Sequence, residues 1–443
     1  MIHGFPVLGT VSDLDRICKK YKPKAVFVAI SNLDSAVARQ FCRDGMLRDL
    51  RVTVVRGVES DGATLRMRDL KFEDLLPRLS RSLDAAPVKT MLSGRSVMVT
   101  GAGGTIGSEL CRQIASMQPS LLVVLDHSEF NLYQIEQCLR DQFPDLALIP
   151  ILDDLQHRET LDRYLGLHRP QVVFHAAAYK HVPLVEANPY RGAENNIGGF
   201  ANLLQACDDA AVERLVLIST DKAVRPTNIM GATKRVCELL LQNTPVTTTR
   251  LCAVRFGNVL GSSGSVVPRF LEQISAGGPV TVTHPDITRY FMLVPEAVSL
   301  VLQAGAMASH GEIFILDMGE PVRIADLARQ LIYMAGKRPG VDIEIKYSGL
   351  RPGEKLYEEL LMDESERGTP IQSITVSRPT LVNWPTLRDD CQRLLDACTA
   401  CDQGKFATAL RAVVPEWTPN PDMAAALDRE RNRASGRFKE VHH

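Results

Sequence analysis

A short apolar strand that runs into a glycine-rich turn and then a helix constrains the fold of this chain most strongly. Residues 96–100 read Ser-Val-Met-Val-Thr, and Gly-Ala-Gly-Gly-Thr-Ile-Gly follows before a helical pattern begins at Ser108. Gly101 permits the tight turn, Gly104 lets the backbone approach a pyrophosphate, and Gly107 lets helix and strand pack closely. The arrangement predicts an α/β protein with a Rossmann-type, doubly wound parallel sheet. The residues predicted to bind a nucleotide at this turn are Thr100, Gly101, Gly103, Gly104, Thr105, Ile106 and Gly107.

A second strand favours a nucleotide site over a purely structural glycine turn. Residues 121–125 are apolar and end in Asp126, at about the distance expected for a carboxylate that binds the adenosine ribose hydroxyls. A carboxylate there repels a 2′-phosphate, and neither His127 nor Ser128 supplies a guanidinium to hold one. NAD is therefore favoured over NADP.

The next two strand ends add candidate contacts to the same cofactor. Residues 148–152 lead to Asp154, which either reads the adenine amino group or is an ordinary loop carboxylate. Residues 171–175 lead to three alanines, whose small side chains allow a flat cofactor to lie against the backbone, and Lys180 enters the same cleft. The contacts predicted from these two strand ends are Asp154, Leu155, Ala176, Ala177, Ala178 and Lys180.

Candidate chemistry follows a fifth strand. Residues 215–218 read Leu-Val-Leu-Ile, and the chain then changes abruptly to Ser219-Thr220-Asp221-Lys222. A buried parallel strand delivers polar side chains in this way to the carboxyl edge of a sheet, where ligands bind. Met230 and Lys234 are spaced to lie one turn apart on one helix face. Ser219 and Lys234 are predicted to contact the cofactor; the competing interpretations are cap chemistry at a solvated turn and a surface ion pair.

Composition excludes several classes of function. The 443 residues include 51 Lys+Arg and 52 Asp+Glu, so no basic field indicates nucleic-acid binding. The sequence shows no signal peptide and no apolar run long enough to span a bilayer. Cys398 and Cys401, with Cys391 upstream, lack the further ligands of a structural zinc site, so no metal is expected. We predict a soluble protein of the reducing cytoplasm.

Changes of pattern along the chain predict several parts. The first part has strand patterns at 25–30 and 51–55 and a helical pattern around 35–43, but no phosphate loop. We interpret it as a truncated, nucleotide-binding-like α/β domain. The predicted parts are this domain at 1–85, a linker at 86–93, a catalytic domain at 94–380 with a substrate lobe mainly within 258–362, and a helical C-terminal extension at 381–443 that is frayed from Arg429.

Five motifs together resemble one enzyme family. They are Thr-Gly-Ala-Gly-Gly-Thr-Ile-Gly from Thr100, Ala-Ala-Ala-Tyr-Lys-His-Val-Pro-Leu-Val-Glu from Ala176, Ser-Thr-Asp-Lys-Ala from Ser219, Arg-Phe-Gly-Asn-Val-Leu-Gly-Ser-Ser-Gly-Ser-Val from Arg255, and Arg-Pro-Gly-Glu-Lys-Leu from Arg351. Residues 94–362 are similar to the large nucleotide-sugar 4,6-dehydratases, of the WbpM/PglF/CapD type, in the extended short-chain dehydrogenase/reductase superfamily. The resemblance implies UDP-N-acetylglucosamine as the substrate, a tightly held and recycled NAD(H), and a role in bacterial glycan or polysaccharide biosynthesis.

The resemblance also implies a cellular setting. Large members carry membrane helices and a nucleotide-binding-like domain ahead of the catalytic part, so this chain resembles a soluble fragment without its anchor. The fragment itself would make no membrane contact, whereas the full-length protein would be anchored at the cytoplasmic face of the inner membrane. Helices flanking the cofactor domain commonly pair in this superfamily, which implies a homo-oligomer.

One departure from the wider superfamily affects the first proton transfer. Most short-chain dehydrogenases place a tyrosine where this sequence has Met230, and a thioether is a poor proton acceptor. The large dehydratases share this substitution, so the resemblance survives it. Thr220, or a water relayed through the ribose and Lys234, would then have to move the proton.

The implied reaction oxidises C4 of the sugar, eliminates water across C5 and C6, and returns hydride to C6. Lys222 is the candidate base at C5, as a neutral amine beside Lys180, Lys234 and the cationic nicotinamide. Asp221 is the candidate acid at the C6 oxygen, and Thr220 would hold the C4 hydroxyl while Lys234 binds the nicotinamide ribose. The substrate contacts implied by the resemblance are Lys180, Asn258, Val259, Arg289, Arg351 and Glu354.

Two other functions fit the same features. A nucleotide-sugar 4-epimerase of the same fold would use the same cofactor and return hydride to C4. A non-catalytic nucleotide-sugar sensor would bind its ligand without forming reduced nicotinamide. The adjacent acid and base at the strand end favour elimination over both.

Overall fold

The chain divides into two compact units. The computed structural model describes residues 6–10, 13–28, 51–56, 66–69, 84–245, 248–262, 264–359 and 367–434. The larger unit comprises Ser82–Ser262, Met292–Met318 and Leu350–His443; the smaller comprises Met1–Arg81, Ser263–Phe291 and Gly319–Gly349.

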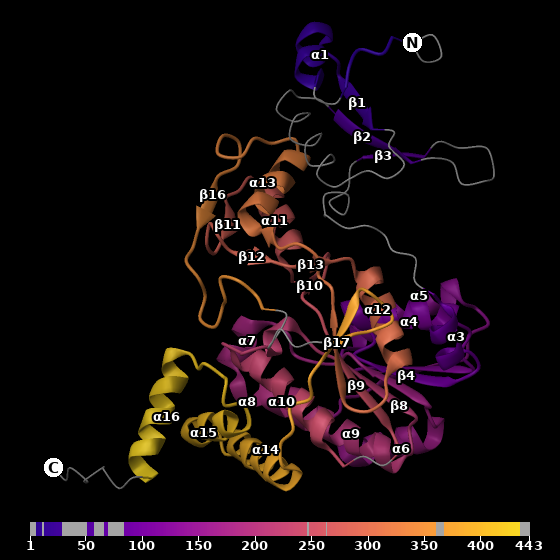
Figure 1. The fold of residues 1–443 in the computed structure, drawn as a ribbon, viewed down its shortest axis with the longest axis vertical. Coiled ribbons are helices and arrows are strands. Elements are labelled where there is room, and N and C mark those ends of the chain that lie inside the picture. Colours follow the sequence, from indigo (N-terminus) through magenta and orange to yellow (C-terminus); the bar gives the residue numbers. More distant parts are fainter. Residues whose placement is uncertain are drawn as a thin grey trace, which may run out of the picture. The chain divides into compact units, whose positions relative to one another are not determined.

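A nine-stranded sheet organises the larger unit (Figure 1), in the order β17-β18-β14-β9-β8-β7-β4-β5-β6. The seven strands from β6 to β14 run parallel, and β18 and β17 continue the sheet antiparallel. Their bounds are β4 (Ser96–Thr100), β5 (Leu121–Asp126), β6 (Leu148–Leu152), β7 (Val172–His175), β8 (Arg214–Ile218), β9 (Arg250–Arg255), β14 (Glu312–Leu316), β17 (Arg367–Gly368) and β18 (Ile374–Ser377). The strand order reverses at β4, as in a doubly wound sheet, so the predicted fold class is confirmed.

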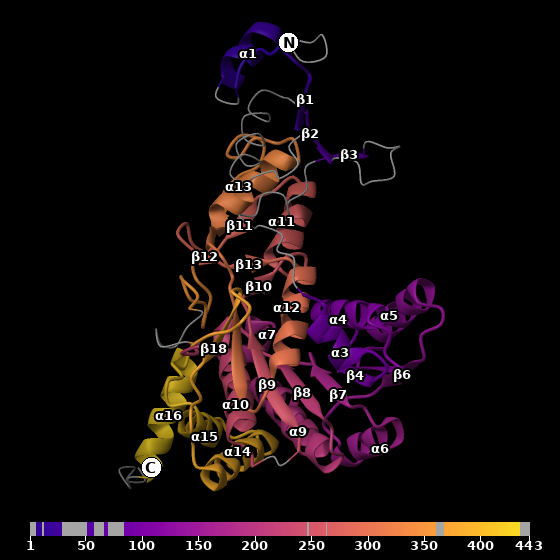
Figure 2. The ribbon, with the colours of Figure 1, turned by 45° about the vertical axis from the view of Figure 1, so that its right-hand side comes forward.

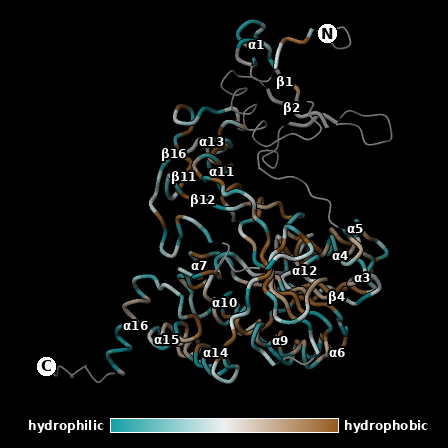
Figure 3. The backbone as a smooth tube through the Cα atoms, in the orientation of Figure 1, coloured by the Kyte–Doolittle hydropathy of each residue, from teal (hydrophilic) through white to brown (hydrophobic). Residues whose placement is uncertain are grey.

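Helices cover both faces of this sheet (Figure 2), which is why its central strands are apolar throughout. Met98 and Val173 lie in one core cluster with side chains of the helices on one face. A Cβ added to Gly305 on the other face would meet Val216 and Phe174. The first set of helices includes α6 (Arg158–His168), α9 (Gly199–Asp209) and α10 (Ile229–Asn243), and the second includes α4 (Thr105–Ser116), α5 (Glu129–Gln142) and α12 (Val294–Met307). Hydrophobic colour gathers accordingly along the strands and α12 in Figure 3.

The predicted linker at residues 86–93 is wrong. Residues 86–92 form helix α3 (Ala86–Leu92), which packs against α12 and buries Val88, Met91 and Leu92. Pro87 stands in the first turn of this helix, where the missing backbone N–H removes no helical hydrogen bond. The segment is therefore part of the larger unit's core.

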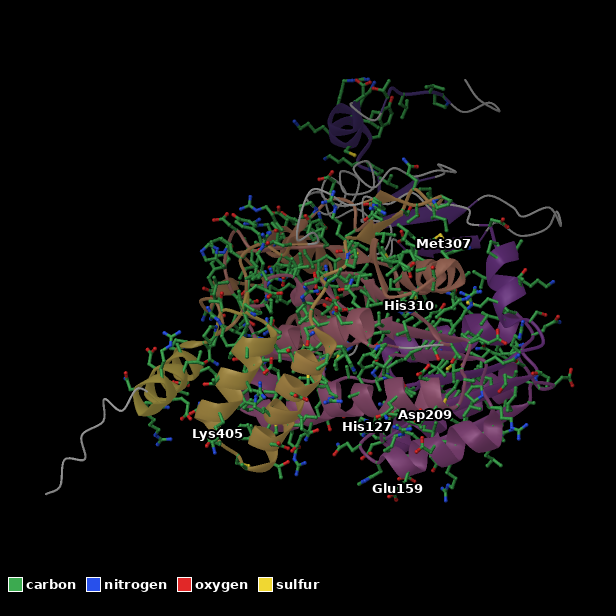
Figure 4. All side chains as sticks on the ribbon, turned by 60° about the horizontal axis from the view of Figure 1, so that its bottom comes forward. His127, Glu159, Asp209, Met307, His310 and Lys405 are labelled. Carbon is green, nitrogen blue, oxygen red and sulfur yellow. The ribbon has the colours of Figure 1, made fainter. Side chains whose placement is uncertain are left out.

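Three C-terminal helices pack against α10 and the helices before it. They are α14 (Trp384–Thr399), α15 (Gln403–Val413) and α16 (Pro421–Ala434). Leu394, Phe406 and Trp417 are buried in the same cluster as α10, whereas charged side chains such as Lys405 point outward (Figure 4). Because α16 continues to Ala434, the predicted fraying from Arg429 is wrong for residues 429–434; residues 435–443 lie outside the described part.

The smaller unit contains short paired strands and two amphipathic helices. Strand β11 (Val280–Val282) pairs parallel with β16 (Ile345–Tyr347), and β12 (Thr288–Arg289) pairs antiparallel with β15 (Val322–Arg323). The helices are α11 (Val266–Ser275) and α13 (Ile324–Met334). Residues 263–291 and 319–349 of this unit fall within the range 258–362 predicted for the substrate lobe, whereas residues 292–318 supply α12 and the sheet strand β14 to the larger unit.

The N-terminal part contains α1 (Leu14–Tyr21) and a three-stranded sheet. Strand β1 (Ala25–Val28) pairs parallel with β2 (Arg51–Arg56), which pairs antiparallel with β3 (Arg66–Asp69). The helix predicted around residues 35–43 lies outside the described residues. Among the described residues, no helix combines the length and apolarity that a bilayer crossing requires.

We expect Trp417→Ala to lower the free energy of unfolding by about 3–5 kcal/mol, because it leaves a cavity in a packed core. The Trp417 side chain is 1% exposed, whereas the control Leu381→Ala removes a side chain that is 82% exposed. Urea denaturation followed by circular dichroism measures both variants. Equal midpoints would mean that the C-terminal helices do not belong to the larger unit's cooperative core.

Candidate active site

The glycine-rich loop after β4 closely matches a phosphate-binding turn. Gly101 has a φ of +67°, and a Cβ on Gly107 would lie 2.0 Å from the Gly101 carbonyl oxygen, so helix and loop touch. Gly104 precedes the first residue of α4, which leaves the helix N-terminus facing the loop. Asp126, at the end of β5, accepts a 2.9 Å hydrogen bond from the Gly103 N–H and another of 2.9 Å from Ser128. The carboxylate thus joins the turn, where a ribose could still use its remaining lone pairs.

Lys234 is a buried cation without a partner in the part of the chain that the structure describes. Its residue is 6% exposed, and its ammonium makes no hydrogen bond or ion pair with the described residues. Burial lowers the pKa of Lys234, although Cys237 and Glu238 oppose that effect. An orphaned buried ammonium on α10 fits the predicted contact with a nicotinamide ribose, so the residues present are compatible with NAD.

The end of β7 is held in place by Asn196. This residue lies in a short π-helical segment (Glu194–Gly198), a feature often found at functional sites. Its side chain accepts from the Tyr179 N–H at 2.8 Å and donates to the Thr233 hydroxyl at 2.9 Å. Asn196 therefore ties the segment that carries Lys180 to α10, beside Lys234. Lys180 is exposed, although partial desolvation lowers its pKa.

The polar residues after β8 form a tight cluster around the Lys222 ammonium. Its Nζ lies 3.0 Å from Asp221 Oδ1, 3.2 Å from Asn258 Oδ1 and 3.6 Å from Glu358 Oε1. The Thr220 hydroxyl donates to Asp221 Oδ1 at 2.9 Å. Asp221 is 1% exposed, and its Oδ2 has no hydrogen-bond partner among the described residues.

The electrostatic surroundings of Lys222 differ from those expected. The sequence predicted cationic neighbours, Lys180 and Lys234, that would favour a neutral amine. The structure places two carboxylates in contact with the amine, and negative neighbours favour the ammonium form. The Asp221–Lys222 pair is also mostly buried, so it is not an exposed surface ion pair.

A loop segment at residues 351–359 delivers Glu358 to this cluster. Its Lys355 ammonium donates to the Val224 carbonyl at 3.0 Å, and the Gly353 carbonyl accepts from Thr227 at 2.9 Å and Asn228 at 3.1 Å. The segment therefore runs along the loop between Lys222 and α10.

Several predicted ligand contacts have other partners in the structure. The Ser219 hydroxyl donates to the buried Glu238 at 2.7 Å, and Asp154 accepts from the Gln156 N–H at 2.9 Å. The side chain of Leu155 is buried in the core, as is that of Met230. Glu354 accepts from the Arg351 N–H in its own turn at 3.1 Å. Asn258 accepts a hydrogen bond from Lys222, and the next residue, Val259, is buried. Arg289 belongs to the smaller unit.

Three residues near the site were not predicted. Glu358 belongs to a Glu-Glu pair just after the Arg-Pro-Gly-Glu-Lys-Leu motif, which was the one available signal. Asn196 lies in an ordinary helical pattern. Glu238 sits where an amphipathic helix commonly carries an exposed charge, yet it is fully buried.

The fold is the Rossmann-type fold of nucleotide-sugar dehydratases and epimerases of known structure. Residues 97–379 match the family described as "Polysaccharide biosynthesis protein", and the chain belongs to that family.

Known relatives agree with this placement. The capsular polysaccharide biosynthesis protein CapD of Staphylococcus aureus is 45% identical over 80% of this chain and 60% of its own length. A UDP-glucose 4-epimerase of Rickettsia canadensis is 32% identical over 62% of this chain and 80% of its own length. The X-ray structure of Pen from Bacillus thuringiensis is similar with a TM-score of 0.59 and 30% identity, over 65% of this chain and 88% of that one. The chain thus spans well under two thirds of CapD's length.

We expect Gly231→Ala to displace the loop of residues 219–228, which carries the candidate residues Asp221 and Lys222. A Cβ on Gly231 would lie 2.1 Å from the Lys222 carbonyl oxygen, so either α10 or the loop must shift. The substitution should cost about 1–3 kcal/mol of stability. The control Gly166→Ala, in α6, meets nothing within 4 Å and should stabilise by about 0.5–1 kcal/mol. Urea denaturation measures the free energy of unfolding of both variants. An unchanged free energy of unfolding in Gly231→Ala would contradict the close packing of Gly231 against Lys222.

We expect a pH-dependent loss of stability from His175. Its ring is 2% exposed, and Nδ1 lies 2.8 Å from the Thr100 hydroxyl. Burial, with a contribution from Lys234, lowers the pKa of His175 from 6.5 to about 3. Between these two pKa values the unfolded chain binds a proton at His175 and the folded chain does not. The free energy of unfolding therefore falls as the pH drops below about 6.5, by up to about 1.4 kcal/mol per pH unit.

The variant His175→Asn tests this source. Asparagine places a polar atom near the Nδ1 position but does not titrate, so the variant should lose that slope between pH 6 and pH 4. Denaturation curves collected across this range compare the two proteins. Parallel slopes would show that His175 is not the group responsible.

Proposed function

We propose that this protein is an NAD-dependent UDP-N-acetylglucosamine 4,6-dehydratase that forms UDP-2-acetamido-2,6-dideoxy-4-keto-hexose. The observation that carries the proposal is the hydrogen-bonded Asp221–Lys222 pair, which combines an amine and a buried carboxyl at the carboxyl end of β8. An elimination needs one group to take a proton from C5 and another to give one to the C6 oxygen. The family membership supports a nucleotide sugar as the substrate.

This chain offers a cradle for NAD. The glycine loop from Thr100 to Gly107 would hold the pyrophosphate, Asp126 the adenosine ribose, and Lys234 the nicotinamide ribose. Ala176–Ala178 would leave space beside the end of β7. When bound there, NAD would supply reversible hydride transfer, so the sugar could be oxidised at C4 and reduced at C6 without an added oxidant.

The Asp221–Lys222 pair would handle the protons of the elimination. The 3.0 Å hydrogen bond between Nζ and Oδ1 lets one proton move between amine and carboxylate. With the proton on Asp221, the Lys222 amine can take the C5 proton, and Asp221 can give its proton to the departing C6 hydroxyl. Asp221 Oδ2, buried and without a partner in the described part of the chain, supplies a position for that transfer.

The first proton, from the C4 hydroxyl, needs a route other than Met230. That side chain is 3% exposed and packs in the apolar core. Thr220 can accept through its hydroxyl oxygen while donating to Asp221. Lys234, whose pKa is lowered by burial, can pass a proton through the ribose. We assign Thr220 to the C4 hydroxyl, and Lys180, Asn258, Val259, Arg289, Arg351 and Glu354 to the rest of the substrate.

A 4-epimerase is the second candidate, because epimerases also match this chain. An epimerase needs no acid at C6, whereas this site has a carboxyl directly bonded to the candidate base. Product mass separates the two reactions, since only dehydration removes water. A sensor without turnover would form no reduced nicotinamide.

The setting follows the same proposal. We place the protein in the cytoplasm, as a homo-oligomer. Its 43% identity to a relative described as a membrane protein, from Methanocaldococcus jannaschii, supports membrane anchoring of the full-length protein. Cross-linking and size measurements on the purified chain test the assembly.

We expect Lys222→Ala and Asp221→Asn each to reduce dehydration by at least about a thousandfold while leaving NAD bound. Each substitution removes one of the two proton-transfer groups and leaves the glycine loop intact. The control Asp342→Asn removes an exposed carboxylate that pairs with Arg338 in the smaller unit, and it should leave dehydration unchanged. Product formation from UDP-N-acetylglucosamine, read by mass spectrometry and NMR, measures the effect. Retained turnover in either site variant would remove the assigned role.

A further inference from the structure

We propose that Glu358 is a positioning residue that sets the pH at which Lys222 gains and loses its proton. The proposal rests on the function assigned above to the Asp221–Lys222 pair. It adds a third member, from a distant part of the chain, whose carboxylate contacts the Lys222 amine.

The geometry gives Glu358 a defined relation to Lys222. The Glu358 side chain is 4% exposed, and its Oε1 lies 3.6 Å from Nζ. Together with Asp221 Oδ1 and Asn258 Oδ1, it gives the ammonium three oxygen neighbours. An ammonium has three N–H donors, so this arrangement suits the protonated amine.

The placement of Glu358 is built into the fold. The neighbouring Glu359 pairs with Arg225 and with Lys355, the latter at 3.2 Å. Gly353, with a φ of +75°, packs against Asn228 so closely that a Cβ would lie 2.8 Å from the Asn228 Cβ. These contacts fasten the segment to the loop after Lys222, and Glu358 is thereby held at the amine.

The charges that surround Lys222 determine the effect of Glu358. Asp221 contacts the amine from the turn after β8, Glu358 contacts it from the segment 351–359, and Asn258 is neutral. The nearby cations Arg225 and Lys355 are paired with Glu359. In the described part of the chain, two carboxylates therefore contact the Lys222 ammonium, and Glu358 is the one that takes no part in the proposed proton exchange.

This extra anion biases the Asp221–Lys222 pair. One proton shared by the two groups gives either ammonium with carboxylate or amine with carboxylic acid. Glu358 stabilises the ammonium form by Coulomb attraction. It therefore opposes early loss of the proton and favours the form that can return a proton to C5 at the end of the cycle.

The test is the pH profile of kcat in Glu358→Gln. Glutamine keeps the size and a hydrogen-bonding oxygen but removes the charge, so Lys222 should lose its proton more readily. The acidic limb of the profile should move to lower pH by about one to three units. Glu344→Gln is the matched control: it removes an exposed carboxylate that pairs with Lys346 in the smaller unit, and it should leave the limb in place.

A second measurement does not depend on turnover. Competitive labelling of Lys222 with acetic anhydride, read by peptide mass spectrometry over a pH series, reports the midpoint of its deprotonation directly. This midpoint should move to lower pH in Glu358→Gln and stay unchanged in Glu344→Gln. Glu358→Asp keeps the charge but moves it away from the Lys222 amine, because aspartate is one methylene shorter. It should give a smaller shift of the midpoint, and it replaces Glu358→Gln in the test if that variant does not fold.

The outcomes separate the two proposals. If the wild-type protein performs no dehydration but the labelling midpoint of Lys222 still moves in Glu358→Gln, the role of Glu358 is supported and the proposed dehydratase function is ruled out. Loss of activity in Glu358→Gln with an unmoved limb and an unmoved labelling midpoint would make Glu358 a structural residue and overturn the inference.

Discussion

The buried Glu238–Arg255 pair is the interaction on which the site depends. Glu238 is 0% exposed and accepts from Arg255 Nε and Nη2, both at 2.6 Å, from Ser219 at 2.7 Å and from Arg235 at 3.3 Å. Burial alone would raise the pKa of Glu238, but the two arginines lower it, so the carboxylate stays charged. The pair ties α10 to the ends of β8 and β9. Those three elements carry the candidate chemistry, and removing one partner would strand a buried charge at a cost of several kcal/mol.

The same network reaches beyond the part of the chain that defines the family. Arg235 also donates to Glu416 at 3.0 Å and to Thr380 at 2.9 Å, and both partners lie after the matched residues 97–379. The Thr418 N–H donates to the Pro226 carbonyl, in the loop between Lys222 and α10. The C-terminal segment therefore contacts the loop between Lys222 and α10 directly, through the hydrogen bond to Pro226. Their packing is part of the catalytic unit's structure, because the buried charges of α10 have partners there.

The sequence predicted well what short segments determine. The glycine loop, Asp126 and the strand end at Ser219 were recognisable because strand, turn and helix signals follow each other within a few residues. Glu358 could not be placed, since its role comes from a contact with Lys222 that only the folded chain creates. The linker error had a local cause: Ala-Ala-Pro indicates a break, yet proline also suits the first turn of a helix, and the burial of Leu92 against α12 decided between the two.

Because Met230 stands where most short-chain dehydrogenases have a tyrosine, side chains other than residue 230 would have to carry the proton transfers. A phenol would add a titratable group to α10, but the buried thioether adds none, so Lys234 is the α10 side chain that the proposed proton route uses. The Asp221, Lys222 and Glu358 side chains carry one positive and two negative charges when all are ionised. Such a cluster favours a protonated amine until a cationic partner or a proton acceptor alters the balance. Oxidation of the substrate at C4 would ease the proton transfer to the amine, because the resulting ketone makes the C5 proton acidic. Elimination would then follow oxidation because of this change in the acidity of the substrate.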